Sequence, residues 1–257
     1  VIPKRVLRLR AFRRCILKQV CNKALNVIIV SQIHKGIVAV GLFHIDKIND
    51  LGCYDYADKI IRIPLSFIAA LGTVMLSKMS NLTAKEEQRE TEKILDMSAC
   101  LVLTLTIGMG FGIAAIAPEF VVWFLGKEFT GTIILLTILA ASIPLVGWNN
   151  YIRTQILIPK EMDKVYTKAV SIGAIVNITI NCGLIYFFGA KGASIATVVS
   201  YAVILVVQMI PLAKEMRGMF HYIVFPVFAG VIMYILVRLS AMLTDKLFIS
   251  VCIELCV

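Results

Sequence analysis

The sequence predicts an all-α protein, a polytopic bundle of helices that cross a lipid bilayer. Of the 257 residues, 59% are hydrophobic, and the mean hydropathy is +0.87, whereas a soluble domain is about 45–50% apolar. The apolar residues gather in runs of about 20, the length of a membrane-spanning helix, and do not alternate over about ten residues as in a membrane β-barrel. These observations argue strongly against a water-soluble monomer.

The apolar runs predict seven full spans. They cover residues 24–45, 60–79, 96–117, 132–151, 166–189, 193–213 and 220–239. An eighth apolar run at 247–257 is too short to cross about 30 Å of hydrocarbon. We therefore expect a truncated eighth span and a chain that is part of a longer protein.

Basic residues are concentrated in alternate connecting segments, at 1–23, 78–93, 153–168 and 214–217. Cytoplasmic loops of membrane proteins are enriched in Lys and Arg, so we expect the N-terminus in the cytoplasm and the 46–59 loop outside. The same distribution accounts for the net charge of +10 without nucleic-acid binding, which uses a basic face on a soluble core.

The connection after the second expected span has a helical signature. Thr83 and Glu86 have the spacing of a capping box, which predicts a helix start at Thr83. Residues 84–95 carry acidic and basic side chains three positions apart. We expect a cytoplasmic helical extension that leads into the 96–117 span.

The sequence carries no signature of catalysis or metal binding. Three histidines and seven cysteines are scattered along it, without HExxH or CxxC spacing, a P-loop or paired catalytic carboxylates. We expect neither an enzyme nor a bound cofactor or metal.

Polar side chains inside the spans are candidates for a substrate path. Lys35 lies beside His34 in the first span, where a charge is costly unless it faces a cavity or a partner. Asn177 and Asn181 are four residues apart and share a helix face. Each set either lines a cavity or makes structural contacts between helices.

A polar run at 147–159 adds Asn149, Asn150 and Arg153 to the candidates. Arg62 is a further cation, expected near the opposite membrane face from Arg153. Both arginines either line the path or anchor their helices at the interface.

Pro144 and Gly147 interrupt the 132–151 span. Proline removes a backbone donor and bends a helix, so we expect a bend in this span.

Five segments resemble the oligosaccharide repeat-unit flippases (Wzx type) of the multidrug/oligosaccharidyl-lipid/polysaccharide exporter superfamily. They are Leu51–Ile61, Ala70–Ser80, Leu125–Phe129, Trp148–Pro159 and Asn177–Ala196. The likeness covers roughly residues 30–213.

The resemblance implies one lobe of a two-lobed transporter that passes an undecaprenyl-diphosphate-linked oligosaccharide across the membrane by alternating access. Residues 1–23 would be the basic cytoplasmic linker between the lobes, 24–213 the six-helix C-terminal lobe, and 214–257 additional trailing helices. Lys35, Arg62 and Arg153 would attract the diphosphate or acidic sugars.

Two positions depart from the family pattern. His34-Lys35 stands where an Asp-Lys pair is frequent, and Ser77-Lys78 stands where Pro-Arg is usual. The expected spans contain no acid at mid-depth, which favours a lipid-linked sugar over a cationic drug. Coupling to H⁺ or Na⁺ is left open.

The function expected from the sequence is transport for surface polysaccharide synthesis in the cytoplasmic membrane of a bacterium. The expected partners are the bilayer, the lipid-linked oligosaccharide, a missing N-terminal lobe, and polysaccharide polymerase or glycosyltransferases. The alternatives are a lipid II flippase or drug antiporter, a non-functional relic, and an assembly partner of a polysaccharide-synthesis complex.

Overall fold

The computed structural model describes residues 48–84, 88–213 and 221–243, and every element in these ranges is a helix. The expected first span at 24–45, with His34 and Lys35, and the apolar run at 247–257 lie outside the described residues.

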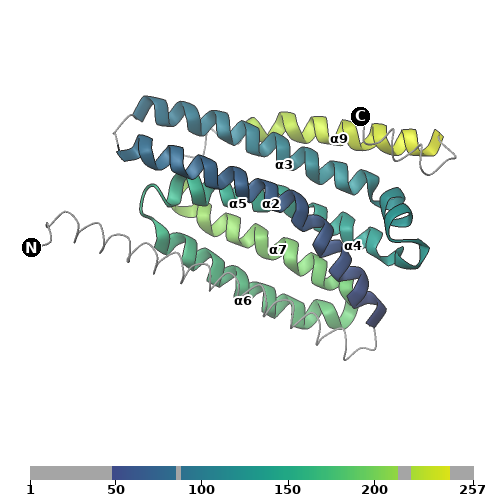
Figure 1. Ribbon diagram of the computed structural model, residues 1–257. Helices are drawn as coiled ribbons and strands as arrows, with labels where there is room; N and C mark the ends of the chain where they lie inside the picture. The colour runs from purple at the N-terminus through teal and green to yellow at the C-terminus, as the bar shows by residue number, and fades with distance from the viewer. Residues whose placement is uncertain (1–47, 85–87, 214–220, 244–257) are drawn as a thin grey trace, which may run out of the picture.

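Six helical segments are long and apolar enough to cross a membrane. They cover residues 50–79, 89–124, 131–157, 163–188, 190–212 and 222–241. They follow the order of the second to seventh expected spans, so the all-α membrane fold is confirmed. Figure 1 shows the helices lying roughly along one common direction.

Helix α2 (Ile48–Ala84) begins well before the expected span. The prediction of a loop at 46–59 was wrong for residues 48–59, which are helical, and the outward orientation of this segment stays a prediction. Two ion pairs with i,i+4 spacing support this extension: Asp55 contacts Lys59 at 2.6 Å, and Asp58 contacts Arg62 at 2.8 Å. Such pairs let charged side chains stay on a helix surface.

Helix α3 (Gln88–Phe124) confirms the helical extension before the 96–117 span, and it continues past Pro118. The predicted start at Thr83 was wrong, because α2 runs through Thr83 and ends at Ala84. After α3 the chain makes a short 3₁₀-helix, η1 (Lys127–Phe129).

The next span is interrupted, as the proline predicts, and consists of α4 (Gly131–Ala140), α5 (Ser142–Tyr151) and the π-helix η2 (Ile152–Leu157). The break lies at Ala141, whose N–H donates to the Ile138 carbonyl at 3.2 Å in a tight turn. Pro144 has no N–H for the Ala140 carbonyl, which explains a break just before it.

Helices α6 (Asp163–Phe188) and α7 (Ala190–Met209) form an antiparallel pair joined by Gly189 alone. Gly189 has φ 58° and ψ −134°, a conformation that needs glycine. The two helices approach closely at Gly192, where an added Cβ would lie 2.1 Å from the Leu184 carbonyl oxygen. The 3₁₀-helix η3 (Ile210–Leu212) follows α7.

Helix α9 (His221–Leu243) packs against α3, at the opposite edge of the bundle from α6 (Figure 1). The Nη1 atom of Arg238 donates to both carboxylate oxygens of Glu119 on α3, at 2.9 and 3.0 Å. This ion pair joins α9 to α3.

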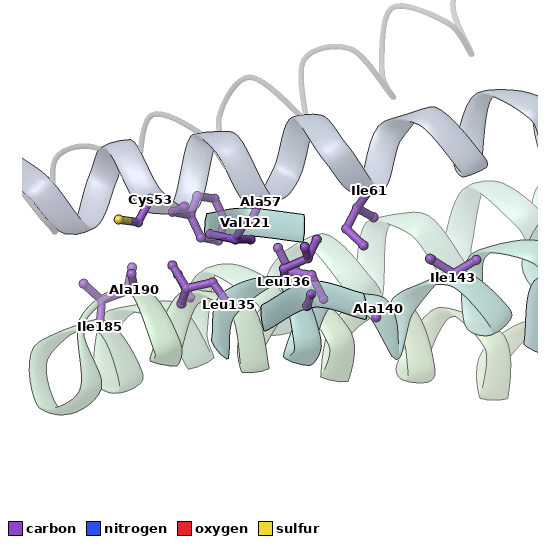
Figure 2. Packing of buried hydrophobic residues seen from close by; sticks show 14 of the residues in the cluster. Cys53, Ala57, Ile61, Val121, Leu135, Leu136, Ala140, Ile143, Ile185 and Ala190 are labelled. Carbon is purple, nitrogen blue, oxygen red and sulfur yellow. The ribbon is translucent and has the colours of Figure 1, made fainter. Parts of the chain in front are cut away.

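The main apolar core lies where α2, α3, α4 and the α6–α7 pair converge. Figure 2 shows how these side chains interdigitate. The labelled residues are Cys53, Ala57 and Ile61 of α2, Val121 of α3, Leu135, Leu136 and Ala140 of α4, Ile143 of α5, Ile185 of α6, and Ala190 of α7. This core fixes one end of α2 on the bundle.

Replacing Gly192 by alanine should separate α6 from α7, because the new methyl group would collide with backbone that cannot rotate away. We expect a loss of about 2 kcal/mol in the free energy of unfolding, measured by thermal unfolding in detergent. Gly183→Ala is the matched control, since nothing lies within 4 Å of its added Cβ. Equal midpoints for the two variants would contradict the close approach.

Glu119→Gln should loosen α9, because it leaves the Arg238 cation partly buried without its carboxylate. Removing one partner of a fully buried pair costs about 3–5 kcal/mol. With 31% of the Arg238 side chain exposed, we expect about 1–2 kcal/mol, read from thermal unfolding. The double variant Glu119→Gln, Arg238→Met should recover most of the stability. A double variant no better than Glu119→Gln would show that the charges do not act as a pair.

Candidate functional site

A groove of about 360 Å³ lies between α2, α5 with η2, α6 and α7. On α2 its lining runs from Asp58 to Ala69, and on α6 from Tyr166 to Ile178. At about 1.5 Å rise per residue, these stretches are roughly 16–18 Å long. This length equals about half of the thickness of a hydrocarbon core.

The groove is lined by polar side chains from all four walls, among apolar ones. The polar lining residues are Asp58 and Arg62 of α2, Asn149, Asn150 and Arg153 of α5 and η2, Tyr166 and Asn177 of α6, and Thr197, Ser200, Tyr201 and Gln208 of α7. Five of the residues predicted from the sequence, Arg62, Asn149, Asn150, Arg153 and Asn177, are therefore brought together.

Helical spacing explains why these side chains meet in one groove. On α7, Ser200, Ile204 and Gln208 are four residues apart and form one stripe. On α2, Asp58, Arg62, Leu65 and Ala69 form another stripe at intervals of three and four. Each stripe faces the other walls across the groove.

Arg62 is compensated by an acid of its own helix. Its Nε donates to Asp58 Oδ2 at 2.8 Å, and about half of the Arg62 side chain is exposed. Helix α2 extends farther than predicted and carries Asp58, near the start of its 50–79 segment, into the groove. The pair adds polarity there without net charge.

Arg153 lies in the π-helix η2, and its guanidinium carbon is 4.7 Å from the centre of the Tyr166 ring. Its Nε is buried without a hydrogen-bond partner, and no acid of the described residues forms an ion pair with it. π-Helical turns are frequent at functional sites. Arg62 and Arg153 both line this groove, and their expected positions near opposite membrane faces stay a prediction.

Asn149 and Asn150 tie α5 to neighbouring helices. Asn149 Nδ2 donates to the Tyr201 carbonyl of α7, and Asn150 Nδ2 donates to the Ile68 carbonyl of α2, both at 3.1 Å. The second contact needs Gly72, because an added Cβ there would lie 2.3 Å from Asn150 Nδ2. These two amides fix the distance of α5 from both walls.

Asn177 and Asn181 form a buried network between α6 and α7. Asn181 Nδ2 donates to Asn177 Oδ1, and Asn177 Nδ2 donates to Ser200 Oγ, both at 2.9 Å. Asn177 lines the groove, whereas Asn181 is fully buried behind it. Asn177 thus links the structural contact to the groove surface.

The helix-bend candidates shape the wall without lining the groove. Pro144 lies in the first turn of α5, after the break at Ala141. Gly147 allows α3 to pack closely against α5, since an added Cβ would lie 2.4 Å from the Thr106 methyl group.

Sequence reasoning missed Asp58, Tyr166, Tyr201 and Gln208. Gln208 lies eight residues, about two helical turns, from Ser200 within the expected 193–213 span, and one such pair is too weak a signal to single it out. Among the described residues, no group of three His, Cys, Asp or Glu side chains is placed to hold a metal ion.

The family model described as "MurJ: Lipid II flippase MurJ" matches residues 17–254. The chain belongs to this family. It is a multi-pass membrane protein, as the six membrane-length helices indicate. The expected resemblance is thus confirmed at the level of the lipid flippases.

The chain is also similar to one curated protein and to one solved structure. The chain is 27% identical over 174 residues to the "Probable low-salt glycan biosynthesis flippase Agl15" of Haloferax volcanii, covering 68% of this chain and 37% of that protein. It also resembles the solved structure "Lipid II flippase MurJ, inward closed conformation", with a TM-score of 0.72 and 18% identity. That match covers 89% of this chain and 49% of the other, so the chain spans about half or less of these relatives' lengths.

Replacing Asn177 by leucine should destabilise this family member, because Asn181 and Ser200 would both lose a buried partner. We expect a loss of about 1 kcal/mol, measured by thermal unfolding in detergent. Thr179→Val on the exposed face of α6 serves as the control, because Thr179 bonds only within its own helix. A larger loss from the control than from Asn177→Leu would rule out the network as a stabilising contact.

Proposed function

We propose that this chain forms one lobe of a transporter that moves a polyprenyl-diphosphate-linked glycan across the cytoplasmic membrane. The observation that carries the proposal is Arg153, a cation in a polar groove between membrane-length helices that has no acidic partner among the described residues. A cation in a membrane-spanning segment needs an anionic partner or water. The diphosphate of a lipid-linked sugar supplies that anion.

The groove suits a substrate with a polar head and an apolar tail. Each polar group without a partner costs several kcal/mol in hydrocarbon, so a glycan cannot cross without a polar path. The outward faces of α2, α6 and α9 expose large apolar side chains, among them Phe67, Ile175 and Phe225. A polyprenyl tail can stay in the bilayer beside such faces while the head occupies the groove.

The glycan is an undecaprenyl-diphosphate-linked oligosaccharide repeat unit in this proposal. The similar segments named above and the relative described as a glycan biosynthesis flippase support it. Lipid II is the second candidate, favoured by the family model and by the solved structure of similar fold. Both carry a diphosphate next to a sugar.

The remaining parts of the proposal follow the sequence. We place the N-terminus in the cytoplasm of a bacterium on the distribution of Lys and Arg. A second lobe would complete the path, and polymerase or glycosyltransferases would act beside it. The Asp58–Arg62 pair leaves no uncompensated acid in the groove, which supports an anionic lipid-linked substrate over a cationic drug.

Arg153→Gln should weaken binding of undecaprenyl diphosphate to the chain in lipid nanodiscs. We expect a loss of about tenfold or more, since a charge-assisted hydrogen bond contributes about 1.5–3 kcal/mol. Lys191→Gln, at the exposed start of α7, is the control and should bind like the wild type. Absence of binding by the wild type, or equal losses in both variants, would refute the proposed function.

A further inference from the structure

Unpartnered polar atoms concentrate in the groove. Of the six buried side-chain nitrogen and oxygen atoms without a hydrogen-bond partner in the described residues, four belong to groove-lining side chains. These four are Asn149 Oδ1, Arg153 Nε, and both Nε2 and Oε1 of Gln208. Gln208 is 0% exposed. Since buried polar groups are nearly always paired, this concentration indicates a ligand site.

The mixture of donors and acceptors defines the chemistry of the ligand. Arg153 Nε and Gln208 Nε2 can only donate, and a diphosphate oxygen satisfies both. Asn149 Oδ1 and Gln208 Oε1 can only accept, and a diphosphate at neutral pH has no proton to give them. An ion alone would therefore leave two buried oxygens unpaired, at about 1–3 kcal/mol each.

Sugar hydroxyl groups and an acetamido N–H group supply the missing donors. A hydroxyl group both donates and accepts, as the amide of Gln208 requires. A purely apolar tail would satisfy none of these atoms.

We propose that Asn149 and Gln208 form a sugar-binding subsite beside Arg153. They accept hydrogen bonds from the sugar that is attached to the diphosphate. This inference rests on the proposed function and names the part of the substrate that these two residues recognise. It makes Gln208 a residue that determines specificity for glycosylated over bare lipid.

The scaffold holds the Asn149 acceptor in place. Asn149 Nδ2 donates to the Tyr201 carbonyl, which fixes the amide plane and leaves Oδ1 as the free end. Gln208 lies two turns farther along α7, on the stripe that contains Ser200 and Ile204. The acceptors therefore come from two different walls.

The test compares two probes on the full chain in lipid nanodiscs: undecaprenyl diphosphate, and the same lipid carrying one N-acetylglucosamine. We expect the wild type to bind the glycosylated probe about tenfold more tightly. Gln208→Leu should lose this preference, so that it binds the two probes about equally tightly. Gln208→Met should lose the preference in the same way. Methionine is closer to glutamine in shape than leucine is, so this variant serves as a second test if Gln208→Leu misfolds.

Gln155→Leu is the matched control. Gln155 is also buried, but it accepts a hydrogen bond from Ser98 and does not line the groove. This variant should keep the sugar preference and lower the unfolding midpoint, because Ser98 loses its partner. Gln208→Leu should keep or raise the midpoint, because it replaces an unpartnered buried amide with an apolar group.

The outcomes separate the two proposals. Equal binding of both probes by the wild type would overturn the sugar subsite and leave the diphosphate function standing. A sugar preference that survives in both Gln208 variants would overturn it as well, as would a midpoint lowered in Gln208→Leu as much as in Gln155→Leu. Failure of the wild type to bind either probe would overturn both the subsite and the proposed function.

Discussion

The close contact of α6 with α7 determines the geometry of the groove. Gly189 turns the chain back within one residue, and Gly192 lets the backbones approach more closely than any side chain would permit. In a bilayer, helices associate through such close packing because lipid tails provide no hydrophobic force between them. In this pair Asn177 of α6 donates to Ser200 of α7. The contact therefore fixes the positions of two walls of the groove relative to each other.

Hydrogen bonding divides the buried polar residues into two groups. Asn177 and Gln155 use their amides for hydrogen bonds to other helices and act as structural contacts, as does the partly buried Asn150. Asn149 and Gln208 have polar atoms without a partner in the described part of the chain, and both line the groove. Since an unpaired buried group costs stability, its retention next to a cation distinguishes a binding surface from a packing surface.

Particular residues show how far the sequence leads. Asn149, Asn150 and Arg153 were found because they break an apolar run, and Asn177 because an amide in a span is conspicuous. Asp58 was missed because charged residues near a predicted span end look like a loop, whereas i,i+4 ion pairs keep them helical. Gln208 was missed because one amide near a span end gives no periodic signal that separates it from an ordinary polar residue.

The sequence by itself determined the membrane fold, the order of the spans and the broken helix at Pro144, because hydropathy and proline act locally along the chain. Only the tertiary structure decided that Arg62 and Arg153 share one groove and that no acid in the described part of the chain pairs with Arg153. Helix tilt and close glycine contacts set these distances between residues remote in sequence, and no local pattern encodes them.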